Sequence, residues 1–174
     1  MGETARIKGS ELLKTMPSGI KSQGILLVDN DHGMNLLNKM RFEDEGLNVV
    51  GEVDNYSKAQ AHVSLGLLGI AVIILDRDLK SPEGNGVDIY KKVQQNPELK
   101  VITIACCGLI GGEKEPGYGE FFVPKPHDEE DMFLAVANAL TAAHVLQQKN
   151  NSHQLAERNE QINANQSSSE GLVA

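Results

Sequence analysis

The sequence predicts an α/β fold: a doubly wound sheet of five parallel strands, of the flavodoxin-like type. The first observation is a set of short apolar runs, strong at residues 24–29, 70–76 and 101–107 and weaker at 48–53 and 121–123. These runs are too short for helices, and the strong ones are rich in β-branched residues, as strands buried on both faces are. The second observation is that segments with helical periodicity separate the runs, which is typical of right-handed βαβ units.

Apolar stripes indicate the helices between these strands. They comprise Leu36, Leu37, Met40 and Leu47; Val87, Tyr90 and Val93; and Phe133, Val136, Ala137 and Leu140. The third stripe has the i, i+3, i+4, i+7 spacing of an amphipathic helix. The second helix should stop before Pro97, because the residue before a proline avoids helical geometry.

The fourth helix is expected to be short, irregular or missing. Residues 108–119 hold five glycines and a proline at the place where the alternation requires a helix. Glycine and proline disfavour a helix by about 1 and about 3 kcal/mol per residue, respectively.

The chain is expected to divide into an arm, one domain and a tail. The arm, residues 1–23, is either a short helix at residues 11–14 or loose, and the domain spans residues 24–146. Residues 147–174 are polar, so we expect the last helix to continue and fray into a disordered tail. Leu155 and Ile162 are seven residues apart, but two positions do not make a coiled coil.

Composition limits the classes of function. A chain of 174 residues with 40% hydrophobic residues suits one domain with one core. Its net charge of −8 argues against nucleic-acid binding, which depends on basic residues. We expect no membrane span and no signal peptide, and therefore a cytoplasmic protein. Cys106 and Cys107 are adjacent, too close for the usual disulfide geometry, and are expected to be buried thiols.

Polar residues follow three of the predicted strands. The first strand leads into Asp-Asn-Asp at residues 29–31, the third into Asp-Arg-Asp at 76–78, and the fifth into Pro-Lys-Pro at 124–126. In doubly wound sheets, ligands bind beyond these carboxyl ends. Converging carboxylates suit Mg²⁺, and an opposing lysine suits a phosphate oxygen. Each aspartate alone could simply cap the following helix. Three strands that all end in polar residues at the same edge of the sheet favour a ligand-binding site instead.

This arrangement resembles the receiver domain of two-component response regulators. Asp29 and Asn30 stand where that family has an acidic pair, Asp76 where it has the phosphoacceptor aspartate, and Lys125-Pro126 where it has a lysine followed by proline. The resemblance covers roughly residues 24–146. It implies that Asp76 takes a phosphoryl group from a histidine kinase or a histidine phosphotransfer protein.

The same resemblance implies the roles of the neighbouring residues. Mg²⁺ would be held by Asp29, Asn30, Asp76 and the main-chain carbonyl of Asp78, while Lys125 would bind a phosphoryl oxygen. The bond between Lys125 and the following proline is cis in relatives, which proline permits.

Several positions depart from the family pattern. Asn30 is neutral where an acid is usual, so Mg²⁺ binding should be weak unless Asp31 turns inward to compensate. Ala105 stands where the family has a Ser or Thr hydroxyl that hydrogen-bonds the phosphoryl group. Phe122 stands where the family has an aromatic residue that moves on activation, and ordinary core packing is the alternative role for it. The loop at residues 77–86 is about two residues longer than usual.

The leading hypothesis is an atypical single-domain response regulator that is phosphorylated on Asp76 and signals through protein contacts. The alternative is a pseudo-receiver that binds a partner without phosphorylation. A metabolic enzyme is disfavoured, because the chain has neither a G-x-G-x-x-G after its first strand nor a Walker A lysine. We expect no output domain, an unidentified downstream protein and, as one option, a homodimer.

Overall fold

The computed structural model describes residues 7–96, 98–108 and 118–170 and contains one five-stranded sheet. The strand order is β2-β1-β3-β4-β5, and every neighbouring pair is parallel. The strands are β1 (Gly24–Val28), β2 (Asn48–Val53), β3 (Ile70–Asp76), β4 (Ile102–Gly108) and β5 (Phe121–Lys125). The predicted doubly wound parallel sheet is therefore confirmed.

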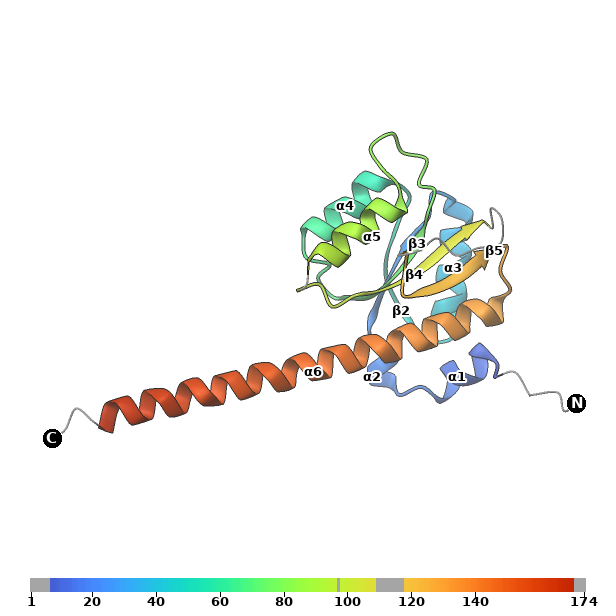
Figure 1. Cartoon of the computed structure of the whole chain (residues 1–174). Helices are drawn as coiled ribbons and strands as arrows, with labels where there is room; N and C mark the ends of the chain where they lie inside the picture. Colours follow the sequence, from blue (N-terminus) through green and yellow to red (C-terminus); the bar gives the residue numbers. More distant parts are fainter. Residues whose placement is uncertain (1–6, 97, 109–117, 171–174) are drawn as a thin grey trace, which may run out of the picture.

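Helices cover both faces of the sheet (Figure 1). They are α1 (Gly9–Thr15), α2 (Ser18–Lys21), α3 (His32–Asp44), α4 (Tyr56–Ser64), α5 (Gly86–Gln95) and α6 (Glu129–Glu170). One core contains side chains from α1, α3 and α6, and the other contains side chains from α4 and α5. Alternate residues of a strand enter opposite cores, since Ile25 lies in the first and Leu26 in the second. This two-sided burial explains why the strands are nearly unbroken apolar runs.

The N-terminal arm packs against the domain through α1. Of the two expected conformations, the short helix is the one observed, and Leu13 on it is fully buried in the first core. Gly9 packs against the main chain of α6, where a Cβ would lie 2.3 Å from the backbone nitrogen of Leu134. The hydroxyl of Ser10 donates a 2.6 Å hydrogen bond to Glu130.

Three of the four residues in the stripe predicted for this helix face the wrong way, while the fourth, Leu47, follows α3 and is buried in the first core. Leu36, Leu37 and Met40 are exposed, while Asn35 and Phe42 are buried. The reason is that the Asn35 amide donates hydrogen bonds to main-chain carbonyls at the ends of β1 and β2, which turns this side of the helix toward the sheet. The helix was predicted correctly, but its buried side was not.

The last helix continues, as expected, but the disordered tail expected over residues 147–174 is corrected as far as Glu170, where α6 ends. Residues 129–170 contain neither glycine nor proline, and extending an existing helix avoids the costly nucleation step. No helix in the described part of the chain is both long and apolar enough to cross a membrane. The short or irregular fourth helix was expected within residues 108–119, of which residues 109–117 lie outside the described residues.

Candidate functional site

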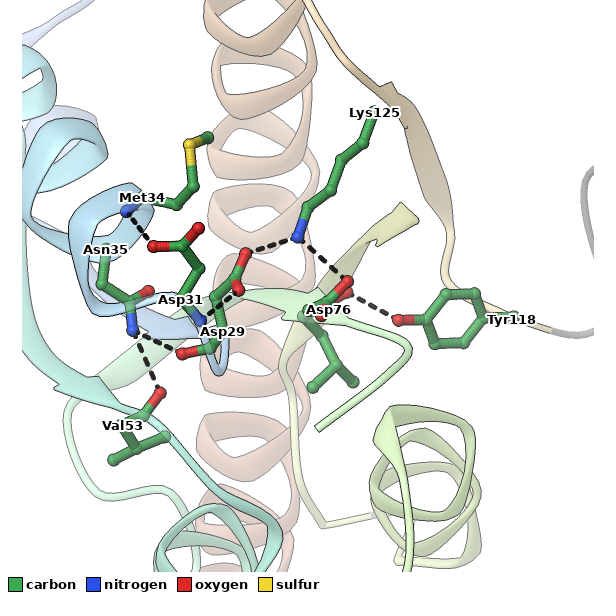
Figure 2. A network of polar contacts seen from close by, with 9 residues as sticks. Asp29, Asp31, Met34, Asn35, Val53, Asp76, Tyr118 and Lys125 are labelled. Carbon is green, nitrogen blue, oxygen red and sulfur yellow. Dashed lines mark hydrogen bonds and ion pairs between the residues drawn. The ribbon is translucent and has the colours of Figure 1, made fainter. Parts of the chain in front are cut away.

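The carboxyl ends of β1, β3 and β5 bring together three of the residues predicted from the sequence (Figure 2). The ammonium group of Lys125 lies 2.6 Å from Oδ2 of Asp29 and 3.0 Å from Oδ1 of Asp76. The two aspartates are buried, and the lysine is partly buried. Lys125 therefore bridges two carboxylates that would otherwise repel each other.

Burial and charge change the acidities of this group. Burial raises the pKa of Asp76, and the Asp29 carboxylate adds to the increase, while Lys125 opposes it. Burial would lower the pKa of Lys125, but its contacts with Asp29 and Asp76 outweigh burial and raise it. The lysine therefore stays positively charged, and Asp76 is a more basic carboxylate than an exposed aspartate.

The backbone around Asp29 holds its carboxylate in place. Oδ1 of Asp29 accepts a 2.8 Å hydrogen bond from the backbone N–H of Asp31, and its carbonyl accepts one of 2.8 Å from the Asn35 amide. Its own N–H donates to the Val53 carbonyl at 3.1 Å. No sequence pattern indicated the role of Asn35, because an asparagine within a helix usually faces solvent.

The other acidic candidates do not join this pair. Asp31 is exposed and caps α3, with Oδ1 accepting a 3.1 Å hydrogen bond from Met34 N–H, so the suggested inward turn does not occur. Asp78 is exposed, and its Oδ1 accepts a 3.1 Å hydrogen bond from Lys80 N–H. Asn30 is half-buried. Any role of Asp78 at the pocket would therefore rest on its main-chain carbonyl, as the resemblance implied.

The long loop at residues 77–86 ends in close contact with Asp76. A Cβ at Gly86 would lie 2.0 Å from the Asp76 carbonyl oxygen, so only glycine fits at this position. The N–H of Gly86 also donates a 2.8 Å hydrogen bond to the Arg77 carbonyl. The next helix begins with a capping box between Asn85 and Asp88. The end of this loop therefore holds the backbone of Asp76 and Arg77 in place.

The donor set can be tested for its fit to Mg²⁺. The described residues hold no cluster of three or more His, Cys, Asp or Glu side chains suited to a metal. Two carboxylates, Asp29 and Asp76, do converge, and protein Mg²⁺ sites often use one or two carboxylates together with water. The residues therefore fit a weak Mg²⁺ site, in which the cation would compete with Lys125 for both carboxylates.

The two expected switch positions are neighbours across β4 and β5. Ala105 pairs with Phe122 in the register of these strands. Ala105 is fully buried, and a Cβ on Gly119 would lie 2.8 Å from its methyl carbon. Phe122 is half-buried at the edge of the second core. The structure leaves little room for a larger side chain at Ala105.

Tyr118 is an additional residue of the site that the sequence reasoning missed. It is fully buried, and its hydroxyl donates a 2.6 Å hydrogen bond to the Leu75 carbonyl, next to Asp76. Its ring packs edge-on against that of Tyr90, with 6.2 Å between ring centroids. The sequence signal that could have indicated Tyr118 is its position as an aromatic residue between two glycines, just before the last strand.

The cysteines behave as expected, since Cys106 and Cys107 are free and buried. Burial raises the pKa of Cys106 to about 12, with Asp29 and Asp76 adding to the effect and Lys125 opposing it. A thiol with this pKa is a poor nucleophile at neutral pH. Cys106 therefore contributes packing beside the pocket rather than chemistry.

Comparison with known proteins gives distant relatives. No family model matches the chain. The transcriptional regulatory protein CpxR of Escherichia coli K12 is 28% identical over 132 residues, which are 73% of this chain and 53% of the relative. CpxR of Klebsiella pneumoniae is 28% identical over 130 residues, covering 72% of this chain and 52% of the relative. The chain spans about half the length of the curated relatives it matches.

Similar solved structures include receiver domains and response regulators. The signal receiver domain of a proposed Luxo repressor from Vibrio parahaemolyticus has a TM-score of 0.60 at 23% identity, covering 71% of this chain and 94% of that one. The response regulator PhyR from Brucella abortus has a TM-score of 0.61 at 19% identity, covering 83% and 56%. A CheY-like receiver domain protein from Methanospirillum hungatei has a TM-score of 0.55 at 17% identity, covering 71% and 97%. These likenesses confirm the predicted receiver fold.

Proposed function

We propose that this chain, whose fold is that of response-regulator receiver domains, accepts a phosphoryl group on Asp76 in a cytoplasmic phosphorelay. The observation that carries the proposal is the buried Asp76 at the carboxyl end of β3, paired at 3.0 Å with Lys125. In this function the chain signals by contacting another protein and is not a metabolic enzyme. The donor is a histidine kinase or a histidine phosphotransfer protein.

The proposed transfer uses groups that the pocket supplies. A carboxylate oxygen of Asp76 attacks the phosphorus of a phosphohistidine, the new O–P bond replaces the P–N bond, and the leaving imidazole nitrogen keeps the electron pair and takes up a proton. Lys125 stabilises negative charge on a phosphoryl oxygen. Mg²⁺ at Asp29, Asn30, Asp76 and the Asp78 carbonyl would supply further charge neutralisation. Burial favours the reaction, because it makes the ionised Asp76 a stronger base.

The helix that follows Asp29 in the chain carries exposed apolar side chains. Leu36, Leu37 and Met40 are exposed on α3, the helix that starts three residues after Asp29. Exposed apolar side chains clustered on one helix mark protein contact sites more often than isolated ones do. We therefore place the docking of the phosphodonor protein on this side of α3.

A pseudo-receiver is the second candidate function, and two observations favour it. Lys125 already occupies both carboxylates, which lowers their availability to a metal or an incoming phosphoryl group. Ala105 provides no hydroxyl for the phosphoryl group and is tightly packed. In this case the partner would bind the domain in its single resting conformation.

Phosphoryl uptake separates the two candidates. The full chain is incubated with Mg²⁺ and phosphoramidate, whose P–N bond mimics that of phosphohistidine, and its intact mass is measured. We expect one added phosphoryl group on the wild type and on Asp78→Asn, whose exposed side chain lies outside the pocket. Asp76→Asn should take up none. If the wild type stays unmodified at saturating donor while it remains folded, phosphorylation is rejected and the pseudo-receiver function stands.

A further inference from the structure

The second half of α6 leaves the domain as a single helix. Among the α6 residues whose side chains the structure describes, the last buried one is Ala143, and a polar contact with the arm joins the Gln23 amide to Gln147 at 3.3 Å. Residues 148–170 continue beyond the sheet without neighbouring elements in view (Figure 1, red). At 1.5 Å per residue this part is about 35 Å long.

Extension of α6 avoids the nucleation step, but its outer part has no apolar face packed against the domain. Nine of these 23 residues are asparagine or serine, which favour a helix less than alanine, leucine or glutamate do. Isolated helices of this length are marginal even with favourable sequences, and most helical stability in proteins comes from packing an apolar face. Packing against a partner would therefore stabilise this part of α6.

Exposed apolar side chains mark the side where a partner would pack. Val145, Leu155 and Ile162 are 43%, 60% and 46% exposed. A coiled coil has 3.5 residues per turn and two core positions, a and d, in each heptad. Leu155 and Ile162 both fall at position d, and Val145 falls at position a. Gln148, Ser152 and Asn159 take the core positions between them, so three of the six core positions from Val145 to Ile162 are polar. The sequence indicated only the pair Leu155 and Ile162. The exposure of Val145 adds a third apolar position to the pattern.

We propose that this stripe binds the same stripe of a second copy of the chain, as a parallel two-stranded coiled coil. Charge supports self-association here: residues 148–170 hold two basic and three acidic residues, a net −1, so the rest of the chain carries −7 of the total −8. The tail is thus the part of this acidic chain on which two copies repel each other least.

The parallel direction follows from the positions of the three apolar residues. In a parallel pair, Val145, Leu155 and Ile162 each meet their own counterpart across the two-fold axis. In an antiparallel pair centred between Leu155 and Ile162, Val145 would lie opposite a point beyond the end of α6 at Glu170. The polar core positions make the association weak and concentration-dependent.

Sedimentation equilibrium of the full chain tests the proposal without phosphorylation, so its outcome is independent of the proposed function. We expect a reversible monomer–dimer equilibrium, with the dissociation constant of the double variant Leu155→Asn, Ile162→Asn raised at least about tenfold. Leu68→Asn is the matched control, because Leu68 is 84% exposed on the domain itself. A wild type that is monomeric at every concentration, or a dimer that the double variant leaves intact, overturns the proposal.

Disulfide trapping tests the direction. Leu155→Cys should cross-link rapidly to its own counterpart under mild oxidation, whereas Gln154→Cys, one residue away on the helix, should cross-link much more slowly. The native Cys106 and Cys107 are buried and do not interfere. Equal rates for the two variants, or a faster cross-link between Leu155→Cys and Ile162→Cys chains than between Leu155→Cys chains, would exclude the parallel pair.

Discussion

The hydroxyl of Tyr118 donates a 2.6 Å hydrogen bond to the main-chain carbonyl of Leu75, the residue that precedes Asp76. This bond ties the segment before β5 to the end of β3. Burial raises the pKa of Tyr118, with the charges of Cys106 and Asp76 adding to the effect, so the hydroxyl stays protonated and remains a donor at neutral pH. Ala105 lacks a hydroxyl, whereas Tyr118 supplies a side-chain O–H donor that reaches the backbone beside Asp76.

Tyr118→Phe should destabilise the fold by about 1–3 kcal/mol, because a buried carbonyl loses a hydrogen-bond partner while the ring still packs. Urea unfolding measures the change. Tyr90→Phe is the control, since the Tyr90 hydroxyl makes a longer bond of 3.3 Å to Glu120 near the surface, and should change stability by less than about 0.5 kcal/mol. Equal losses in the two variants would contradict a special role for the Tyr118 bond.

Asp76→Asn should stabilise the folded chain at neutral pH. The folded state raises the pKa of Asp76 above its usual 3.8, chiefly by burial, so the folded chain binds the proton more tightly than the unfolded chain does. The contribution of Asp76 to stability is therefore present at low pH and is lost as the pH rises through the folded-state pKa. Asparagine mimics the protonated form and avoids this loss.

Unfolding by urea at several pH values checks this prediction. The stability difference between Asp76→Asn and the wild type should be largest near pH 7 and should close below about 3.8, where the wild-type carboxyl is also protonated in both states. Asp78→Asn, which changes an exposed carboxylate, should follow the wild type within about 0.5 kcal/mol. A wild type more stable than Asp76→Asn at neutral pH would mean that the pairing with Lys125 outweighs burial.

The sheet and the pocket were predictable because both depend on local sequence. Apolar runs mark strands buried on two faces, and an aspartate or lysine at a strand's carboxyl end is placed at one edge by the parallel topology alone. Asp29, Asp76 and Lys125 came together for that reason. The approach of Gly86 to the Asp76 carbonyl could not be anticipated, since it depends on the path of a long loop.

The errors arose where tertiary contacts decide between similar local patterns. On α3, two neighbouring stripes were available, and hydrogen bonds from Asn35 selected the one without Leu36 and Met40. Tyr118 was overlooked because its partner, the Leu75 carbonyl, is 43 residues away in the chain. The helical tail was judged by its polar composition, which says little about the extension of a helix already nucleated on a core.

Asn30→Asp should tighten Mg²⁺ binding at the pocket by at least about tenfold, because a full negative charge placed a few ångströms from the cation is worth more than 1.4 kcal/mol at an effective dielectric constant of about 20. Titration followed by amide shifts should move Asp29, Asp76 and Lys125 together. Asp31→Asn is the matched control: asparagine keeps the cap on α3, and the removed charge lies outside the pocket. If Asp31→Asn weakened Mg²⁺ binding as much as Asn30→Asp tightened it, Asp31 would have to be counted as a ligand again.

Ala105→Thr tests whether the missing hydroxyl limits the response to phosphorylation, and Ala105→Val separates the hydroxyl from the added volume. Ala105 is fully buried and closely packed by Gly119, so both larger side chains should cost about 1–3 kcal/mol of stability. Only threonine can donate a hydrogen bond to a phosphoryl group on Asp76. A phosphoryl group shifts a conformational equilibrium only by its differential affinity for the two states, so this extra bond should enlarge the shift.

The readout is the change in amide shifts of Phe122, the strand neighbour of Ala105, between the unmodified and phosphorylated forms. We expect a small change in the wild type and in Ala105→Val, and a larger one in Ala105→Thr. Equal responses in the valine and threonine variants would show that packing alone controls this strand pair. A large response already present in the wild type would show that the chain switches without the hydroxyl, and Tyr118, hydrogen-bonded beside Asp76, would then be the residue to test in its place.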